Sequence, residues 1–393
     1  MIYVERVFFL GAKRISAAGH FEPVQSFSDA PLARSLSRRT PTLVTTYVVI
    51  RPVCAADLSP LQVLADHLDT VNLPDDPVML TGIIADSVRS FAGLSAPVSS
   101  PDPKHAGFTL VAVEIESIHG VVLSEKLLGT ASVFAYHGMP DEPHYYLTVQ
   151  ETTVHSKQLN ADRSRLILKL GRDVEPWTEL GGLIVDPAAR GKGVGKLLVA
   201  ARLLLIAMHR THFCRRLLAE LLPPRRPDGG NAFWDAVGGP LTGLEYYRAD
   251  LLCRSDKEFI EAFFPHEEIV GDLLPSAARE LIGKEGAATT PVRTLLRRAG
   301  FKYLGTIDPF DAGPHDGADV SAIGPIQRSR KLARLDLPPL GATTPYLLGN
   351  PATHRFITTD AEIVHDGLRV PHDYSARLGL TPGQACWVMP LDW

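Results

Sequence analysis

Cysteine is scarce in this sequence, and no two cysteines lie close enough to act together. The chain has four of them, and none belongs to a C-x-x-C pair: Cys54, Cys214, Cys253 and Cys386. This spacing predicts neither a zinc-binding cysteine cluster nor the disulfide framework of a small secreted domain. We therefore expect no bound metal ion and no disulfide framework.

Long apolar runs are missing as well. The best of them, Leu203 to Ala207, is flanked by Arg202 and Arg210, whereas a membrane-spanning helix needs roughly 18–20 consecutive apolar residues. The first residues lack the charged start, the apolar stretch and the cleavage site of a secretory signal. These absences predict a cytoplasmic protein with no membrane partner.

Charge of one sign does not dominate the chain, because its formal net charge is -4. This balance argues against a protein that binds nucleic acid over its whole surface. The distribution is nevertheless uneven. Residues 190–226 carry nine basic side chains and one acid, Glu220, so that this stretch has a charge of +8 and the rest of the chain -12. A solvated helix face and a site for an anion both fit such a stretch.

What the chain does contain is ordinary for a globular protein. Hydrophobic residues make up 45% of its 393 residues and charged residues 21%, which is enough to bury a substantial core. At roughly 100–200 residues per domain, this length predicts two or three structural units. We expect an N-terminal extension over residues 1–46, a main region over 47–325 and a small β-rich domain over 326–393.

The pattern of apolar residues predicts alternating strands and helices in the main region. Runs rich in β-branched residues indicate strands, and apolar residues at 3.6-residue spacing indicate helices. The expected strands are 45–52, 108–114, 128–136, 177–185, 216–222 and 301–307, and the expected helices begin near 55 and cover 193–209 and 290–299. Beyond 326, short β-like segments separated by turns include 355–358 and 386–389.

The most informative segment joins one of these strands to the helix 193–209. The strand ends at Asp186-Pro187, and a loop of pattern R-x-x-G-x-G, from Arg190 to Gly195, leads directly into the helix. Glycines before a helix N-terminus let several backbone N–H groups approach one anion, and the helix dipole favours negative charge there. Arg190 and Lys192 add positive charge, so the segment suits a pyrophosphate.

Two other phosphate-binding patterns do not fit this loop. A Rossmann fingerprint needs G-x-G-x-x-G directly after the strand, and a P-loop needs Ser or Thr after its G-K pair. Here Gly195-Lys196 is followed by Leu197. The pattern V-D-P-x-x-R-G-x-G-x-G instead resembles the acyl-coenzyme A pyrophosphate loop of the GNAT superfamily of N-acyltransferases. That resemblance implies an α/β (α+β) fold, the GNAT acyl-CoA N-acyltransferase fold with a mixed central sheet, to which the C-terminal β-rich domain is added.

Further segments, in order along the chain, resemble the arginine N-succinyltransferase family. They span residues 47 to about 330 and include Tyr47-Val-Val-Ile-Arg-Pro-Val53, Val154-His-Ser-Lys-Gln-Leu-Asn160, Arg248-Ala-Asp-Leu-Leu-Cys253 and Ile307-Asp-Pro-Phe-Asp-Ala-Gly-Pro314. No single segment is specific, but the set in this order is. The chain is thus similar to an enzyme family that succinylates arginine.

Three positions depart from the pattern of the resembled enzymes. The family's proton-donor histidine, in an I-G-x-x-H-P segment, is replaced by Gly286, and the tyrosine that many GNAT enzymes use corresponds to Leu296. The segment Leu221-Leu-Pro223 stands where the family has M-R-G. Because the resemblance places Gly286 and residues 221–223 near the acceptor, we predict that arginine is not the best acceptor.

The resemblance implies a reaction in which an amine attacks an acyl-CoA thioester. A succinyl-CoA-like thioester is the implied co-substrate, no cofactor is permanently bound, and the acceptor is the amine of an amino acid or a related small molecule. By the same resemblance, the strand end supplies a backbone N–H for the oxyanion and the loop binds the pyrophosphate. The implied coenzyme-binding residues are Leu183, Ile184, Val185, Arg190, Gly191, Lys192, Gly193, Val194, Gly195 and Lys196.

Three side chains are candidates for the proton transfer that this reaction requires. Glu220 lies on the strand after the loop helix, and its alternative interpretation is a structural partner for an arginine. Glu285 is adjacent to Gly286, and its alternative is an exposed loop charge. His155 belongs to the Val154–Asn160 segment and is expected to line the acceptor pocket, with a structural role as its alternative.

Two alternatives keep the fold but change the function. An aminoacyl-tRNA donor fits the basic stretch at 190–226, and its binding should weaken steeply with salt. A non-catalytic subunit of a two-subunit succinyltransferase fits the missing histidine, although such a subunit has no need of an intact R-x-x-G-x-G loop. Besides acyl-CoA and the small-molecule amine acceptor, the partners to consider are therefore tRNA and a second subunit, in a homo- or hetero-oligomer.

Overall fold

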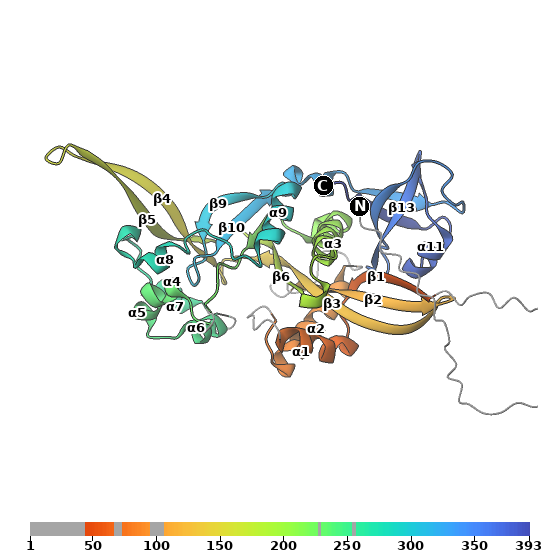
Figure 1. The fold of residues 1–393 in the computed structure, drawn as a ribbon, viewed down its shortest axis with the longest axis horizontal. Coiled ribbons are helices and arrows are strands. Elements are labelled where there is room, and N and C mark those ends of the chain that lie inside the picture. Colours follow the sequence, from red (N-terminus) through yellow and green to blue (C-terminus); the bar gives the residue numbers. More distant parts are fainter. Residues whose placement is uncertain (1–43, 67–72, 95–105, 227–228, 254–256) are drawn as a thin grey trace, which may run out of the picture.

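A single mixed β-sheet runs through the protein in its computed structural model, which describes residues 44–66, 73–94, 106–226, 229–253 and 257–393. The strand order is β12-β15-β11-β14-β13-β1-β2-β3-β6-β7-β10-β9-β4-β5-β8. The pairs β6–β7 and β11–β14 are parallel, and the other described pairs are antiparallel. Helices lie against this sheet along its length (Figure 1). The α/β fold with a mixed central sheet expected from the sequence is confirmed.

The first strands form a long antiparallel meander. β1 (Val44–Pro52), β2 (Gly107–Ile118) and β3 (Val121–His137) are rich in β-branched residues, which suit a pleated surface. The helices α1 (Leu58–Asp66) and α2 (Pro77–Gly93) pack on them through shared core residues. Residues 44–46, which we expected in the extension, begin β1, and residues 1–43 of that extension lie outside the described residues.

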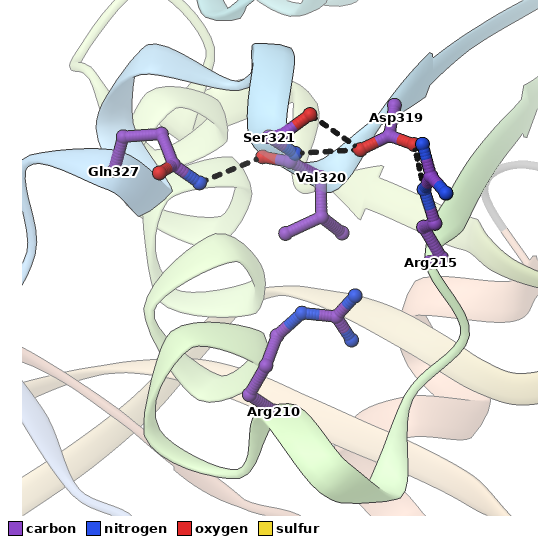
Figure 2. A pocket seen from close by; sticks show the side chains of 6 residues that line it. All are labelled: Arg210, Arg215, Asp319, Val320, Ser321 and Gln327. Carbon is purple, nitrogen blue, oxygen red and sulfur yellow. Dashed lines mark hydrogen bonds and ion pairs between the residues drawn. The ribbon is translucent and has the colours of Figure 1, made fainter.

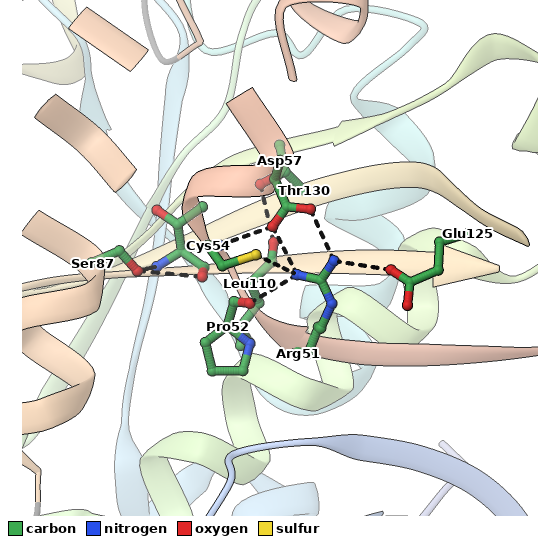
Figure 3. A network of polar contacts seen from close by, with 9 residues as sticks. Arg51, Pro52, Cys54, Asp57, Ser87, Leu110, Glu125 and Thr130 are labelled. Atoms are coloured by element: carbon green, nitrogen blue, oxygen red, sulfur yellow. Dashed lines mark hydrogen bonds and ion pairs between the residues drawn. The ribbon is translucent and has the colours of Figure 1, made fainter. Parts of the chain in front are cut away.

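A buried ion pair between Arg51 and Asp57 links the end of β1 to the turn before α1. The guanidinium of Arg51 donates to both carboxylate oxygens of Asp57, at 2.7 and 2.9 Å, and Asp57 also accepts from the backbone N–H of Cys54 (Figure 3). The Arg51 and Asp57 side chains are only 15% and 6% exposed. Burial alone would raise the pKa of Asp57, but the bonds from Arg51 and Cys54 outweigh burial and lower it.

We expect Asp57→Asn to reduce the free energy of unfolding by about 1–3 kcal/mol at pH 7, because it weakens a charge-assisted pair and leaves a buried cation. A carboxyl whose folded pKa is lowered stabilises the fold above its unfolded pKa and loses that contribution as pH falls through the folded pKa. The difference between variant and parent should therefore shrink below about pH 4.

Urea unfolding near pH 7 and near pH 3 measures this difference, with the exposed Asp366→Asn as a control that should change stability little. An equal difference at both pH values would contradict the assignment.

The central part of the sheet contains the loop predicted to bind an anion. β6 (Trp177–Val185) leads through a short turn at Pro187–Ala189 into α3 (Val194–Met208), and the chain returns as β7 (Arg216–Glu220). These elements confirm the expected strand 177–185 and helix 193–209. α3 lies deep in the largest hydrophobic cluster, where residues 198–206 are fully buried. The loop before it therefore starts from a rigid support.

A long two-stranded arm precedes this central part in the chain, and a set of short helices follows it. β4 (His144–Ser156) and β5 (Ala161–Asp173) form the arm, which extends away from the body in Figure 1. The helices of residues 232–279 pack around a cluster of aromatic side chains beneath it. They are α4 (Ala232–Ala236), α5 (Gly238–Thr242), α6 (Tyr246–Leu252), α7 (Glu258–Phe263) and α8 (Ser276–Arg279), with β8 (Glu268–Val270) on the edge of β5.

The next two strands in the sheet after β7, namely β10 and β9, come from later in the chain. α9 (Thr290–Ala299) leads to β9 (Lys302–Ile307) and β10 (Pro314–Asp319), and α10 (Gly324–Gln327) follows. The expected helix 290–299 and the strand near 301–307 are confirmed. β10 pairs with β7, which brings His315 opposite Glu220. No helix in the described ranges has the length and apolar character needed to cross a membrane.

The C-terminal strands close into a ring. In order around it they are β12 (Thr344–Gly349), β15 (Ala385–Pro390), β11 (Arg330–Arg334), β14 (Gly367–Arg369) and β13 (Phe356–Val364), which returns to β12. α11 (His372–Leu378) connects β14 to β15. β13 also pairs with β1 through Val49↔Ile357 and Ile50↔Phe356. The expected β-rich segment is present, and its division from the main region at residue 326 stays a prediction.

Candidate functional site

β6 and β7 run parallel but are paired only near their beginnings. The pairing joins Thr178 to Leu217 and Glu179 to Leu218, and no later residue of β6 pairs with β7. A bulge at Gly182, where φ is +56°, redirects β6 at this point, while β6 stays paired with β3 as far as Val185. Because a strand offers hydrogen-bonding groups along both edges, residues 183–185 have an edge without a β7 partner, on which the Val185 carbonyl accepts from Nε of Arg190 at 3.3 Å. The predicted oxyanion contact there stays a prediction.

The loop between β6 and α3 gathers donors for an anion. Gly191 and Gly193 have φ of +74° and +83°, the left-handed region that favours glycine, and no atom lies within 4 Å of a Cβ built on either. Gly193 directly precedes α3, whose first N–H groups have no acceptor inside the helix. Arg190 and Lys192 are exposed beside them. Backbone donors and two cations are thus available at one end of α3.

Lys196 has partners other than the loop. Its Nζ donates to the carbonyl oxygens of Leu391 and Trp393, at 2.7 and 2.9 Å, and it lies 5.3 Å from the centre of the Trp393 ring. Burial lowers the pKa of Lys196. The structure therefore ties this lysine to the C-terminal segment, and its predicted contact with the coenzyme stays a prediction.

Glu220, at the end of β7, is surrounded by histidines from three other strands. Nε2 of His144 and Nε2 of His137 lie 3.0 and 3.6 Å from the same Glu220 oxygen, Oε1. The ring of His315 lies 5.1 Å from that of His144. Oε2 of Glu179, on β6, lies 3.2 Å from Nδ1 of His137. We call these five residues the histidine–glutamate cluster.

Burial sets the charges in this cluster. It lowers the pKa of His137 to about 3 and that of His315 to about 4. Burial alone would raise the pKa of Glu220, but His144, His315 and His137 lower it well below its ordinary value. Burial, aided by the charge of Glu220, raises the pKa of Glu179. At neutral pH the cluster therefore holds a charged Glu220 beside the neutral imidazoles of His137 and His315, and its potential favours a cation.

The Glu220 side chain is also reachable, because 29% of it is exposed while that of His144 is 6% exposed. Its close contacts are with histidines, so the alternative interpretation as a partner for an arginine does not describe it. Glu220 lies two residues beyond the last β7 residue paired with β6, beside the opening between these strands. A group bound along the open edge of β6 would meet this carboxylate.

Glu285 has the arginine partner instead. Its carboxylate pairs with Nη1 of Arg293 on α9, and the same guanidinium donates to both oxygens of buried Asp316, at 3.0 and 2.8 Å. Burial alone would raise the pKa of Glu285. A backbone hydrogen bond and Arg293 have the larger combined effect, and the pKa lies below its ordinary value. Its side chain is 22% exposed, so it is not the free loop charge of the alternative interpretation. The structure does not join Glu285 to the histidine–glutamate cluster.

Gly286 and residues 221–223, which both depart from the resembled family, are in contact with each other. The N–H of Gly286 donates to the carbonyl of Leu222 at 2.9 Å, and a Cβ at position 286 would lie 2.8 Å from the carbonyl oxygen of Pro223. No side chain fits there without moving the 221–223 backbone. Leu296 is buried in the core and 1% exposed. Neither usual acid of the resembled enzymes therefore has a substitute at its own position.

We expect Gly286→Ala to lower the free energy of unfolding by about 1–2 kcal/mol, because overpacking displaces the Pro223 backbone. Thermal unfolding measures the effect. Gly324→Ala is a matched control, since nothing lies within 4 Å of a Cβ at that position. Equal melting temperatures for Gly286→Ala and the parent would show that residues 221–223 can move away from the new methyl group without loss of stability.

His155 lies far from the cluster. It is near the tip of the arm, where its Nδ1 is 2.8 Å from Oδ1 of Asp162 and its side chain is 52% exposed. His144 begins the same strand, and at about 3.3 Å per residue the two histidines are about 36 Å apart. In this chain His155 and Glu220 do not meet, and a role for His155 in an acceptor pocket stays a prediction.

The hollow at the other end of α3 offers no competing site. It has a volume of about 320 Å³ and is lined by Arg210, Arg215, Asp319, Val320, Ser321 and Gln327 (Figure 2). Arg215 pairs with Asp319, which also accepts from Ser321, and Gln327 donates to the carbonyl of Val320 at 3.1 Å. These polar groups are largely occupied with one another, so the hollow does not present the converging free groups of a reaction site.

Sequence reasoning missed four members of the histidine–glutamate cluster. His137, His144, Glu179 and His315 come from four different strands, and their spacing along the chain matches no motif. The one available signal was Glu220 itself, which the loop and strand order placed at the end of β7. Only the pairing of β10 with β7, and the meeting of the end of β3 with the start of β4, brings the histidines to it.

Comparison with known proteins gives a consistent result. Residues 48–325 match the family model described as arginine N-succinyltransferase beta subunit. Arginine N-succinyltransferase of Yersinia enterocolitica is 29% identical, over 87% of this chain and 97% of that protein, and that of Citrobacter koseri is 30% identical, over 79% and 87%. The solved structure of arginine/ornithine succinyltransferase subunit AI from Pseudomonas aeruginosa aligns with a TM-score of 0.70 and 25% identity, covering 88% of this chain and 99% of that one.

Proposed function

Because this chain belongs to the arginine N-succinyltransferase family, we propose that it transfers a succinyl-like group from acyl-CoA to the amine of an amino acid or a related small molecule. The chain is an acyltransferase with the GNAT fold, and acyl-CoA is its co-substrate. The identity of the acyl group and of the acceptor is the proposed part. We also propose that no cofactor is permanently bound.

The observation that carries this proposal is the combination of an anion-binding loop with an open strand edge that leads to a charged carboxylate. The glycine loop before α3 suits a pyrophosphate, and the unpaired edge of β6 suits an extended pantetheine arm. Glu220 stands beside that opening. The thioester carbonyl would then lie near the backbone of 183–185, whose N–H groups stabilise the oxyanion.

The attacking amine must be neutral, and an amino group carries a proton at neutral pH. Ionised Glu220 can orient the ammonium group of the acceptor and take its proton, directly or with His144, 3.0 Å away, as a relay. Holding the amine and the thioester in one place also contributes several kcal/mol, so transfer does not depend on a dedicated acid at position 286. The departing thiolate can be protonated by solvent.

The direct test is an acyl-transfer assay with purified full-length protein. Succinyl-CoA and acetyl-CoA are each supplied with a panel of amines, and release of coenzyme A thiol is followed together with the mass of the amide product. We expect succinyl-CoA to be the better donor and an N-acylated small molecule to form. Absence of product with every pair would favour the non-catalytic subunit among the alternatives.

Within that panel, we expect an amine other than arginine to give the highest kcat/KM. Residues 221–223 and Gly286 form a wall next to Glu220 that has neither the arginine nor the histidine of the resembled enzymes. A site built to hydrogen-bond one substrate loses discrimination when those groups are absent. Arginine ranking first with succinyl-CoA would contradict this prediction.

The aminoacyl-tRNA alternative needs one continuous basic surface, which residues 190–226 do not form. Arg202 is buried with 1% exposure, Arg216 pairs with Glu175, and Arg215 pairs with Asp319 at the far end of α3. Binding of tRNA depends on many phosphate contacts made together. The acyl-CoA donor therefore has the stronger support.

A further inference from the structure

The histidine–glutamate cluster contains buried imidazole nitrogens without partners. Nδ1 of His144 and Nε2 of His315 make no hydrogen bond among the described residues, while Nε2 of His137 and Nε2 of His144 face Oε1 of Glu220 at 3.6 and 3.0 Å. His144 and His315 are 5% and 0% exposed. Buried polar groups in native proteins nearly always have partners, and a bound ion is one partner that buried imidazole nitrogens take. In the proposed acyl transfer, only His144 among these histidines has a role, as a proton relay to Glu220.

We propose that His137, His144 and Glu220 bind one divalent transition-metal ion, and that Zn²⁺ fits best. One ligand atom from each of the three lies within 4.8 Å of the others. The two Nε2 atoms are 3.0 and 3.6 Å from Oε1 of Glu220. In a tetrahedral site with bonds of about 2.0–2.1 Å, ligand atoms are about 3.3 Å apart. The two distances to Glu220 are within a few tenths of an ångström of that spacing, and the two histidine ligand atoms lie within 4.8 Å of each other.

The chemistry of the donors selects the class of ion. Imidazole nitrogens suit zinc and its neighbours among the transition metals, whereas calcium and magnesium prefer oxygen ligands. A ligating histidine usually gives its other nitrogen to a carboxylate, which fixes the ring. Glu179 has that position behind His137, at 3.2 Å from Nδ1. The arrangement is therefore a ligand set with its supporting shell.

The surroundings leave room for a fourth ligand and favour a cation. Three protein ligands leave a position open for water or for a further side chain. Glu220, Asp308 and His315 also have ligand atoms within 4.8 Å of one another, so His315 is close to the ion's position. Lys257 contributes positive potential at His137, while the carboxylate of Glu220 faces the ion's position directly.

This inference does not rest on the proposed acyl transfer, because ion binding can be measured without any substrate. If both hold, an ion on Glu220 would occupy the carboxylate that handles the acceptor amine. Zinc would then lower acyl transfer, and a chelator would restore it. A protein that binds one zinc ion but shows no acyl transfer would contradict the proposed function and support the proposed metal site.

The test uses the full-length chain, stripped with a chelator and titrated with Co²⁺ and with Zn²⁺. We expect one ion per chain by calorimetry, and visible cobalt absorption bands of the intensity given by four- or five-coordinate nitrogen and oxygen sites. An intense near-ultraviolet band from thiolate ligands would place the ion on cysteine and overturn the proposal. So would the absence of stoichiometric binding.

Variants locate the ion. We expect His144→Ala and Glu220→Gln each to weaken Zn²⁺ binding at least about 100-fold, and Glu179→Gln to weaken it about 10–100-fold through the orientation of His137. His266→Ala removes an exposed histidine outside the cluster and should leave binding unchanged. Unchanged affinity in all the cluster variants would put the ion elsewhere. If a variant does not fold, as circular dichroism will show, the cobalt spectrum of the parent still decides the ligand type.

Discussion

Replacing Glu220 by glutamine is expected to lower kcat/KM for acyl transfer at least about 100-fold without unfolding the protein. Glutamine keeps the size of the side chain but can neither take a proton nor hold an ammonium group by charge. A positioned base contributes about 10²–10⁴ in rate, which sets the expected loss. Steady-state kinetics with a chelator present measures it, so that a bound ion does not contribute.

The structure explains why this carboxylate should matter. Glu220 ends β7 beside the point where β6 and β7 separate, it is 29% exposed, and neighbouring histidines keep its pKa low enough for it to be ionised. His144, whose Nε2 lies 3.0 Å away, is buried and cannot approach solvent by itself. Glu220 is thus the part of the cluster that an incoming amine would meet first.

Glu285→Gln is the matched comparison, and we expect it to lose less than about 10-fold. Its carboxylate is held by Arg293, which is itself fixed by Asp316, so it has little freedom to exchange protons. Circular dichroism and thermal unfolding should show both variants to be folded. A larger loss for Glu285→Gln than for Glu220→Gln would mean that the neighbour of position 286 handles the proton, and our placement of the chemistry would be wrong.

Changes in the loop before α3 are expected to have the next largest effect. Arg190→Ala and Gly193→Val should each weaken binding of coenzyme A at least about 10-fold, the scale of a charge-assisted contact to phosphate. Valine at position 193 must adopt a φ near +83°, a conformation that is strongly unfavourable for a β-branched residue and would distort the loop. If the two contributions are independent, the double variant should lose about 100-fold.

Calorimetric titration with coenzyme A measures these losses, and the chain offers a control for each change. Gly120→Val places valine at a similar φ, +81°, in the β2–β3 turn, where nothing lies within 4 Å of a Cβ. Arg163→Ala removes an exposed charge from the arm. Both controls should bind as the parent does. Unchanged affinity in both loop variants would remove the basis for a coenzyme site here.

The parts of the fold predicted from sequence are those determined by local pattern. β6, the glycine loop and α3 follow one another without a break, so periodicity and glycine placement were sufficient to locate them. Gly191 and Gly193 do have the positive φ that such a turn requires. The short helices of residues 232–279 were not predicted, because helices of four to seven residues show too few turns for a period to appear.

The contacts that define the candidate site depend on strand order, which a local pattern does not contain. His315 reaches Glu220 only because β10 lies next to β7, and His144 does so only because β4 begins beside the end of β3. The same holds for Lys196, whose partners at Leu391 and Trp393 are distant in sequence. The meeting of Gly286 with Pro223 also joins two loops that no sequence spacing relates.

The pairing of β1 with β13 has a consequence for how the chain acquires its structure. Val49 and Ile357 are separated by most of the polypeptide, yet they are neighbours in one ladder. During synthesis, β1 therefore has no β13 to pair with until the last part of the chain has been made. Until then, the edge of β1 at Val49 and Ile50 stays exposed. Such non-local pairing slows folding and prolongs the exposure of apolar surface. We expect yield in cells to depend on growth temperature and chaperone supply more than the stability of the finished protein would indicate.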